Sequence, residues 1–170
     1  MARILIVGGG CRGRLLAGAM AHAGHATRIT TRSERGRAAI EASGAECWIG
    51  TPDRLATLRG ALENVTLACW LLGTASGRAQ QVRALHGSRV QAFVRQLIDT
   101  TARGFIYEAA GPAAPARDAR RGERIVRELA QQNAIPLFAL TADPADVPAW
   151  LTQARAAVRE LLGPQHEAGG

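Results

Sequence analysis

The sequence predicts an α/β protein, with a doubly wound parallel sheet of about six strands in the order 3-2-1-4-5-6. Two observations lead to this fold class. Short apolar runs alternate along the chain with longer segments of helical period, and a glycine-rich turn directly follows the first apolar run. A chain of 170 residues is long enough for one substantial core. We therefore expect one dinucleotide-binding domain over residues 1–163, followed by a flexible tail over residues 164–170.

The short apolar runs predict the strands. In chain order they are Arg3–Val7, Ala26–Thr30, Glu46–Ile49, Thr66–Leu72, Gly104–Ala109 and Pro136–Leu140. The connections between them carry helical periodicity, which is typical of crossover helices that join parallel strands. Helices are therefore expected on both faces of the sheet.

The apolar stripes of the helices follow from the same periodicity. The first helix is expected to bury Leu15, Leu16, Ala19 and Met20. Further helices are predicted from Leu55, Leu58 and Leu62, from Val90, Phe93, Val94, Leu97 and Ile98, and from Trp150, Leu151, Ala154, Val158 and Leu161. Ser33 and Asp118 are expected to cap helices.

The charged residues exclude several chemistries. The formal net charge is +7, and all 21 basic residues are arginine. Without lysine the chain has no P-loop lysine, no Schiff-base lysine and no Tyr/Lys proton-transfer pair. No apolar run approaches the ~18 residues of a membrane span, so we expect a soluble protein that does not insert into a membrane. The N-terminus enters the apolar run Ile4–Val7 almost at once and then meets glycines, which indicates a first strand and not a secretory signal, so a cytoplasmic location is expected.

The cysteines and histidines show no metal-site or disulfide pattern. Cys11, Cys47 and Cys69 are far apart and form no Cys-x-x-Cys pair. Cys47 and Cys69 lie in predicted strands, where we expect buried thiols. The histidines are expected at the surface or in turns, and none is expected to bind a metal: His22, His25, His86 and His166.

The glycine-rich turn carries the main functional signal. Gly8-x-Gly10-x-x-Gly13 follows a strand and opens a helix. In a dinucleotide site the first glycine permits the turn, the second admits the pyrophosphate, and the third lets helix and sheet pack closely. Backbone N–H groups at the helix start, including those of Cys11 and Arg12, would hold the phosphates. Cys11 is either a small packing residue or a redox-sensitive thiol near a helix N-terminus.

The end of the second strand favours NADP over NAD. A site for NAD would carry an acidic residue there to bind the ribose hydroxyls, and this chain has none. It offers Thr31, Arg32 and Ser33 to a 2′-phosphate, with Arg35 or Arg12 as a second cation. The alternative is a solvated helix start in an arginine-rich protein.

The stretch from Ile4 to Gly10, together with Thr31-Arg32-Ser33, resembles the atypical short-chain dehydrogenase/reductase group, with its epimerase/dehydratase and NmrA-like relatives. The resemblance covers roughly residues 2–140. It implies that Gly50-Thr51-Pro52-Asp53 forms the turn near the adenine, where Thr51 stands in place of the family's aspartate and Asp53 can substitute for it. It also implies that Leu72, Gly73 and Thr74 lie along the cofactor ribose.

The catalytic pattern of that group is missing. Its enzymes commonly use a Tyr-x-x-x-Lys pair, and this chain contains no lysine. Tyr107 and Glu108, at the end of the fifth strand, are the candidate proton donors. Because neighbouring residues of a strand point to opposite faces, only one of them can face a given site.

Three functions remain open on these grounds. The first is an NADP(H)-binding module that acts in nucleotide binding or redox sensing. The second is a small NADPH-dependent oxidoreductase for a carbonyl or quinone, in which a partner in a homodimer completes the site and Tyr107 or Glu108 donates the proton. The third is nucleic-acid binding through Arg120, Arg124 and Arg127, although a solvated helix face is favoured for these three.

Overall fold

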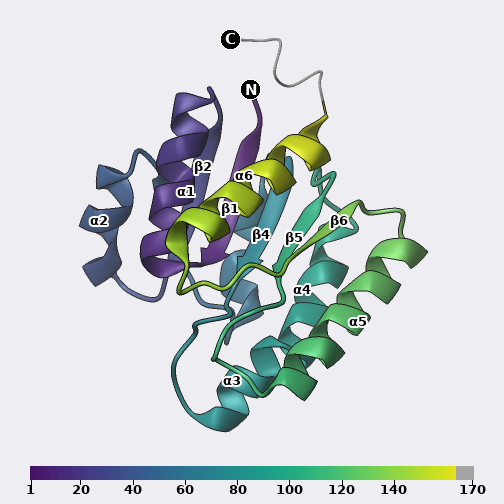
Figure 1. Ribbon diagram of the computed structural model, residues 1–170. Coiled ribbons are helices and arrows are strands. Elements are labelled where there is room, and N and C mark those ends of the chain that lie inside the picture. Colours follow the sequence, from purple (N-terminus) through teal and green to yellow (C-terminus); the bar gives the residue numbers. More distant parts are fainter. Residues whose placement is uncertain (164–170) are drawn as a thin grey trace.

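The computed structural model describes residues 1–163 and contains one sheet of six parallel strands in that range (Figure 1). Their order is β3-β2-β1-β4-β5-β6, which confirms the predicted fold class. The strands are β1 (Arg3–Gly8), β2 (Ala26–Thr31), β3 (Glu46–Ile49), β4 (Leu67–Leu71), β5 (Phe105–Glu108) and β6 (Leu137–Leu140). Each strand begins and ends within one residue of its predicted bounds. The predicted tail over 164–170 lies outside the described residues.

Helices cover both faces of the sheet. The helices α1 (Gly10–His22), α2 (Arg37–Ala42) and α6 (Val147–Leu162) pack on one face. The other face is covered by α3 (Ala79–Leu85), α4 (Ser88–Leu97) and α5 (Ala116–Gln132). Alternation along β1 divides the core accordingly, since Ile4 and Ile6 pack with α1 and α6 whereas Leu5 and Val7 pack with α4.

Two predicted apolar positions are exposed in the structure. Leu15 is 48% exposed, because α1 turns Leu16, Ala17 and Met20 toward the sheet instead. Ile98 is also exposed, since it follows the last residue of α4. The remaining predicted residues of the α4 stripe are fully buried.

The predicted helix over Leu55–Leu62 is wrong. Two short 3-10 turns stand in its place, η2 (Leu55–Leu58) and η3 (Gly60–Leu62). A Cβ on Gly60 would lie 2.9 Å from the Trp48 ring, so the chain passes close to this indole where a continuous helix was expected. Leu58 and Leu62 are nevertheless buried in the core.

The two predicted helix caps also differ. Asp118 lies inside the first turn of α5, whose N-cap is Pro115, and its carboxylate pairs with Arg83 at 3.2 Å. Ser33 occupies the N-cap position of the 3-10 turn η1 (Glu34–Gly36), but its side chain makes no capping hydrogen bond.

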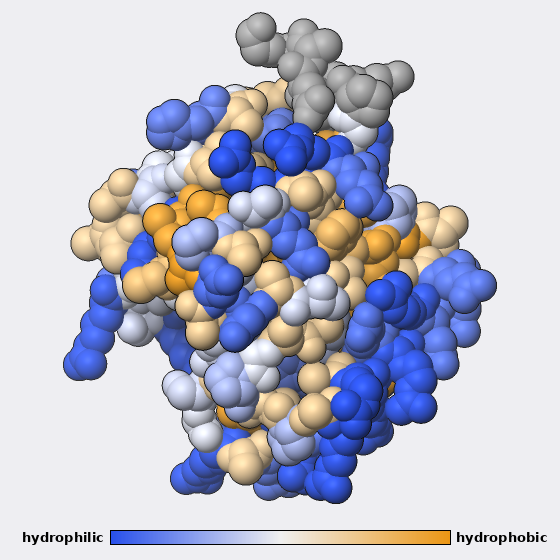
Figure 2. Space-filling view, in the orientation of Figure 1, coloured by the Kyte–Doolittle hydropathy of each residue, from blue (hydrophilic) through white to orange (hydrophobic). Residues whose placement is uncertain are grey.

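Hydrophilic residues gather over α5 in Figure 2. Within this helix Arg127 pairs with Glu123. Within residues 1–163, no helix combines the length and apolar character that crossing a membrane requires.

Candidate functional site

The turn between β1 and α1 has the geometry of a phosphate-binding loop. Gly8 and Gly10 have φ angles of 82° and 51°, in the left-handed region that favours glycine. A Cβ on Gly8 would lie 2.7 Å from the carbonyl oxygen of Leu71, and one on Gly13 would lie 3.0 Å from that of Gly8. A Cβ on Gly10 would meet no atom within 4 Å. The turn is therefore closed toward the protein and open at Gly10.

The start of α1 has donors to offer at this open side. Gly13 donates its N–H to Gly9, but the N–H groups of Gly10, Cys11 and Arg12 donate to no residue within 1–163. The first turn carries no acidic side chain. Unpaired N–H groups and the helix dipole both favour an anion at this position. It lies at the carboxyl end of β1, where the strand order reverses between β1 and β4.

The Arg12 side chain turns inward from this loop and is only 7% exposed. Its guanidinium forms a bidentate ion pair with Glu108 of β5, and Nη2 also donates to Oγ1 of Thr74 at 2.9 Å. The guanidinium lies 4.8 Å from the centre of the Trp150 ring, within the range of a cation–π contact. Arg12 therefore links the glycine turn to β5 and α6, and the carboxylate of Glu108 compensates its positive charge.

Glu108 is fully buried and has four protein donors around its carboxylate. Besides the two from Arg12, Trp150 donates its indole N–H at 2.7 Å and Gly73 donates its backbone N–H at 2.6 Å. A Cβ on Gly73 would lie 2.0 Å from the carbonyl oxygen of Ala110, so only glycine fits between β4 and β5 here. We call Arg12, Gly73, Thr74, Glu108 and Trp150 the carboxylate hub.

Tyr107 lies on the opposite face of β5, away from the carboxylate hub, and is also fully buried. Its hydroxyl is 2.7 Å from Nδ1 of His86, while Nε2 of His86 is 3.2 Å from the carbonyl oxygen of Leu72. Because a carbonyl only accepts, Nε2 carries the imidazole proton and Nδ1 accepts from Tyr107. Burial lowers the pKa of His86 and raises the pKa of Tyr107. His86 lies in the turn that follows α3, one of its two expected places, but it is only 2% exposed and therefore not at the surface.

The predicted 2′-phosphate residues gather at the other side of the crevice, at the end of β2. Arg32 is exposed and pairs with Asp53 at 3.1 Å, which joins the β2 end to the turn after β3. The Oγ1 atom of Thr31 lies 3.4 Å from the carbonyl oxygen of Ser33. Arg35 is exposed and forms no ion pair within residues 1–163. These residues are adjacent to one another, but Arg12 points away from them into the carboxylate hub.

Cys11 is exposed at the first turn of α1. Its Sγ accepts a hydrogen bond from the Arg14 guanidinium at 3.1 Å. Cys69, by contrast, is fully buried in β4, where burial raises its pKa to about 12. Cys47 is half-buried, and burial raises its pKa as well. The expectation of buried thiols is thus confirmed for Cys69 and only partly for Cys47.

A cavity of about 550 Å³ opens at the carboxyl ends of β4, β5 and β6. Thr74 of the carboxylate hub lines it, together with Gly111, Pro112 and Asp143 from the loops after β5 and β6. It therefore continues the crevice from the glycine turn past β4, in the region where open α/β sheets bind their ligands.

Comparisons with known proteins bear on the fold. Alfalfa vestitone reductase is 15% identical with a TM-score of 0.61, and the match covers 82% of this chain and 56% of the reductase. The Citrobacter triphenylmethane reductase complexed with NADP(H) is 18% identical with a TM-score of 0.60, and the match covers 81% of this chain and 48% of the reductase. The binary complex of leucoanthocyanidin reductase with NADPH from Vitis vinifera is 22% identical with a TM-score of 0.56, and the match covers 81% of this chain and 46% of the reductase. The chain has the fold of these reductases.

This likeness confirms the expected Rossmann fold. The chain spans about half the length of the three structures. No family model matches the sequence, and no curated protein matches it either.

Sequence reasoning missed two features of the site. It did not predict that Arg12 and Glu108 meet, although both stood among its candidates, because a contact over 96 residues has no local signal. It assigned Trp150 only to the apolar stripe of the last helix. The absence of lysine excluded a Tyr/Lys pair but gave no signal for either contact.

Proposed function

We propose that this protein binds NADP(H) across the carboxyl edge of its sheet and acts as a nucleotide-binding or redox-sensing module. The observation that carries the proposal is the open turn at Gly10, with its three unpaired N–H groups at the start of α1. These groups would hold the pyrophosphate. The NADP(H) and NADPH complexes among the similar structures support a dinucleotide as the ligand.

The preference for the phosphorylated dinucleotide rests on the end of β2. The last residues of β2 and the two that follow, Arg32 and Ser33, include no acidic residue to accept from ribose hydroxyls, whereas the exposed Arg32 and Arg35 are cations. Arg32 is paired with Asp53, and a doubly charged 2′-phosphate would compete for its guanidinium. Thr31 and Ser33 would donate hydroxyl hydrogen bonds to the same phosphate. Cys11 has a solvent-exposed thiol and would lie beside the bound pyrophosphate, so it is the group that we propose for a redox response.

The experiment is a titration of the protein with NADPH and NADH, followed by nicotinamide fluorescence. We expect tighter binding of NADPH than of NADH. In Arg32→Ala the affinity for NADPH should fall about tenfold or more, because a charge-assisted bond to phosphate is lost, while the affinity for NADH changes little. Glu123→Gln, on α5, serves as a control. Equal affinity of the wild type for both dinucleotides would remove the claim of NADP preference.

A second candidate, an NADPH-dependent oxidoreductase, is favoured by the cavity beside Thr74. Bound NADPH would supply a hydride to a carbonyl or quinone, and a proton must then reach the substrate oxygen. Tyr107 is enclosed by His86, and Glu108 is occupied by its four donors, so neither has a free path to that cavity in this conformation. Asp143 lines the cavity and is exposed to solvent, which makes it the better placed donor. NADPH oxidation with a panel of carbonyls and quinones, in wild type and Asp143→Asn, tests this candidate.

A further inference from the structure

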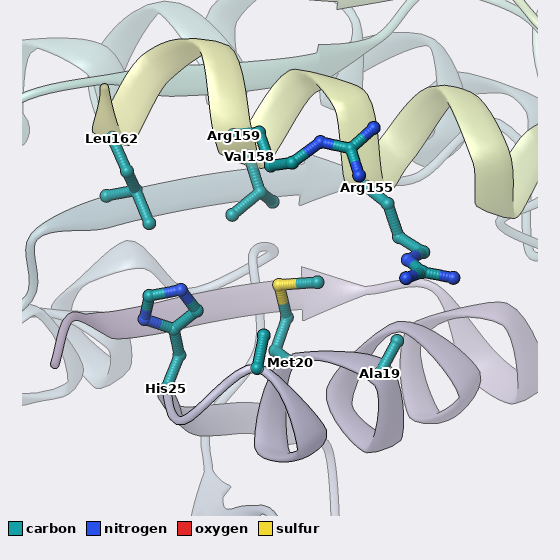
Figure 3. Close-up of a pocket in the computed structure, with 8 residues that line it drawn as sticks. Ala19, Met20, His25, Arg155, Val158, Arg159 and Leu162 are labelled. Carbon is teal, nitrogen blue, oxygen red and sulfur yellow. The ribbon is translucent and has the colours of Figure 1, made fainter. Parts of the chain in front are cut away.

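A second cavity lies between α1 and α6 and belongs to no part of the proposed dinucleotide site (Figure 3). Its volume is about 270 Å³. Met20 of α1 and Val158 and Leu162 of α6 supply apolar side chains, while Arg155 and Arg159 come from the same face of α6. Arg155 extends from α6 toward α1 in Figure 3.

This cavity lies toward the amino end of the sheet. Helix α1 begins beside the carboxyl end of β1 and runs back along the sheet, and the cavity touches its last turns. His25, which also lines it, accepts a hydrogen bond at Nδ1 from the backbone N–H of Ala2, next to the start of β1. The glycine turn lies at the other end of the same helix. The cavity is therefore separate from the proposed dinucleotide site.

The charges around the cavity have one sign. Arg155 and Arg159 form no ion pair within residues 1–163, and no acidic side chain lines the cavity. Arg159 lies in the last turn of α6, where a cation is favourable to the helix dipole. Arg155 lies one turn earlier, beyond the range of that effect, so the dipole does not account for it. Two guanidiniums four residues apart are neighbours on a helix and can hold one carboxylate.

We propose that this cavity binds a small amphiphilic carboxylate, such as a medium-chain fatty acid. Its carboxylate would lie between Arg155 and Arg159, and its alkyl chain would cover Met20, Val158 and Leu162. The volume equals that of roughly nine water molecules, at about 30 Å³ each, which matches a ligand of about ten non-hydrogen atoms. A mostly apolar pocket with a few convergent polar groups is the usual form of a small-molecule site.

The experiment is calorimetric titration of the full chain with octanoate and with 1-octanol, which has the same chain length and no charge. We expect saturable binding of octanoate, with octanol at least about tenfold weaker because it cannot accept charge-assisted hydrogen bonds as a carboxylate does. Equal binding of the two compounds, or no saturable binding of octanoate, would overturn the proposal.

Two further measurements place the ligand. The double variant Arg155→Ala/Arg159→Ala should lose octanoate affinity about tenfold or more, whereas Arg120→Ala, on the exposed face of α5, should keep it. The chain contains only two methionines, so labelling their methyl groups with ¹³C gives a simple spectrum. Octanoate should shift the Met20 methyl signal at the concentrations that saturate the calorimetric signal. An unchanged Met20 signal, or unchanged affinity in the double variant, would contradict binding in this cavity.

Discussion

Tyr107 and Glu108 are neighbours in β5, yet they satisfy their polar groups in two different ways on the two faces of the sheet. Tyr107 meets one neutral partner, His86, among the apolar residues that pack with α4 and α5. Glu108 meets a cation, an indole and a backbone N–H on the face of α1 and α6. Both side chains are fully buried.

Of these two buried groups, the one on the α1 and α6 face of the sheet connects to the crevice. The Tyr107–His86 pair joins β5 to the end of α3 and to the carbonyl of Leu72, behind the ligand-binding edge. The carboxylate hub joins the glycine turn, the end of β4 and α6 through one carboxylate. Changes on the two faces should therefore differ both in size and in their effect on the ligand.

The largest expected effect is that of Glu108→Gln. The substitution leaves the Arg12 guanidinium buried without a compensating charge, which costs about 3–5 kcal/mol in comparable pairs. Urea unfolding at neutral pH measures the change. Glu123→Gln breaks an exposed ion pair on α5 and should cost less than about 1 kcal/mol. A loss for Glu108→Gln as small as that of the control would refute the buried ion pair.

The double variant Arg12→Met/Glu108→Gln tests whether the two buried charges compensate each other. Removing both charges leaves no uncompensated ion, so the double variant should be more stable than Glu108→Gln alone. Independent losses that simply add would show that the two residues do not interact.

A smaller loss is expected for Tyr107→Phe. The substitution removes the only donor within residues 1–163 to Nδ1 of His86 and leaves a buried acceptor unpaired, at a cost of about 1–3 kcal/mol. Dinucleotide affinity should stay unchanged, because this pair lies behind the crevice. Fluorescence titration of the folded variant with NADPH checks this, and a large loss of affinity would place Tyr107 in the binding site instead.

His86 makes the stability depend on pH in one direction. Burial lowers its pKa below the ordinary 6.5, so the unfolded chain takes up the proton first as the pH falls. Its contribution is complete above pH 6.5 and decreases as the pH falls from there toward the lowered pKa of the folded state. Unfolding free energies at several pH values should show a shallower acid loss in His86→Asn than in the wild type. Parallel curves would contradict a neutral buried imidazole.

Arg32→Ala should change stability least. Its ion pair with Asp53 is exposed, and such pairs contribute about 0–1 kcal/mol. Thermal unfolding of the variant should match that of the wild type in the absence of ligand. Stabilisation by NADPH should nevertheless be smaller in the variant, since a ligand stabilises according to its affinity for the folded state. Equal stabilisation of both proteins would mean that Arg32 does not hold the 2′-phosphate.

Local patterns were sufficient to predict the sheet. Strand runs such as Ile4–Val7 and the glycine turn after them depend on neighbouring residues only, and their bounds and order agree with the structure. The segment from Leu55 to Leu62 shows the limit of the method. Its leucines have helical spacing, but close packing of Gly60 against Trp48 accompanies a break into two short turns.

The polar interior was much less predictable. Arg12 was expected to serve as a second cation for the ligand, and His86, which was expected at the surface or in a turn, lies in a turn but away from the surface. Both are buried because a partner distant in sequence, Glu108 or Tyr107, compensates for the loss of water. Periodicity carries no information about such partners, since they depend on how the strands and helices are arranged in space.

The most direct test of the central claim is an NMR titration of the ¹⁵N-labelled protein with NADPH. The backbone amide signals of Gly10, Cys11 and Arg12 should shift in a saturable way, together with that of Arg32, while the amide signals of α5 stay in place. Binding that leaves the amides at the start of α1 unchanged, or no binding at all, would contradict a dinucleotide site at the glycine turn.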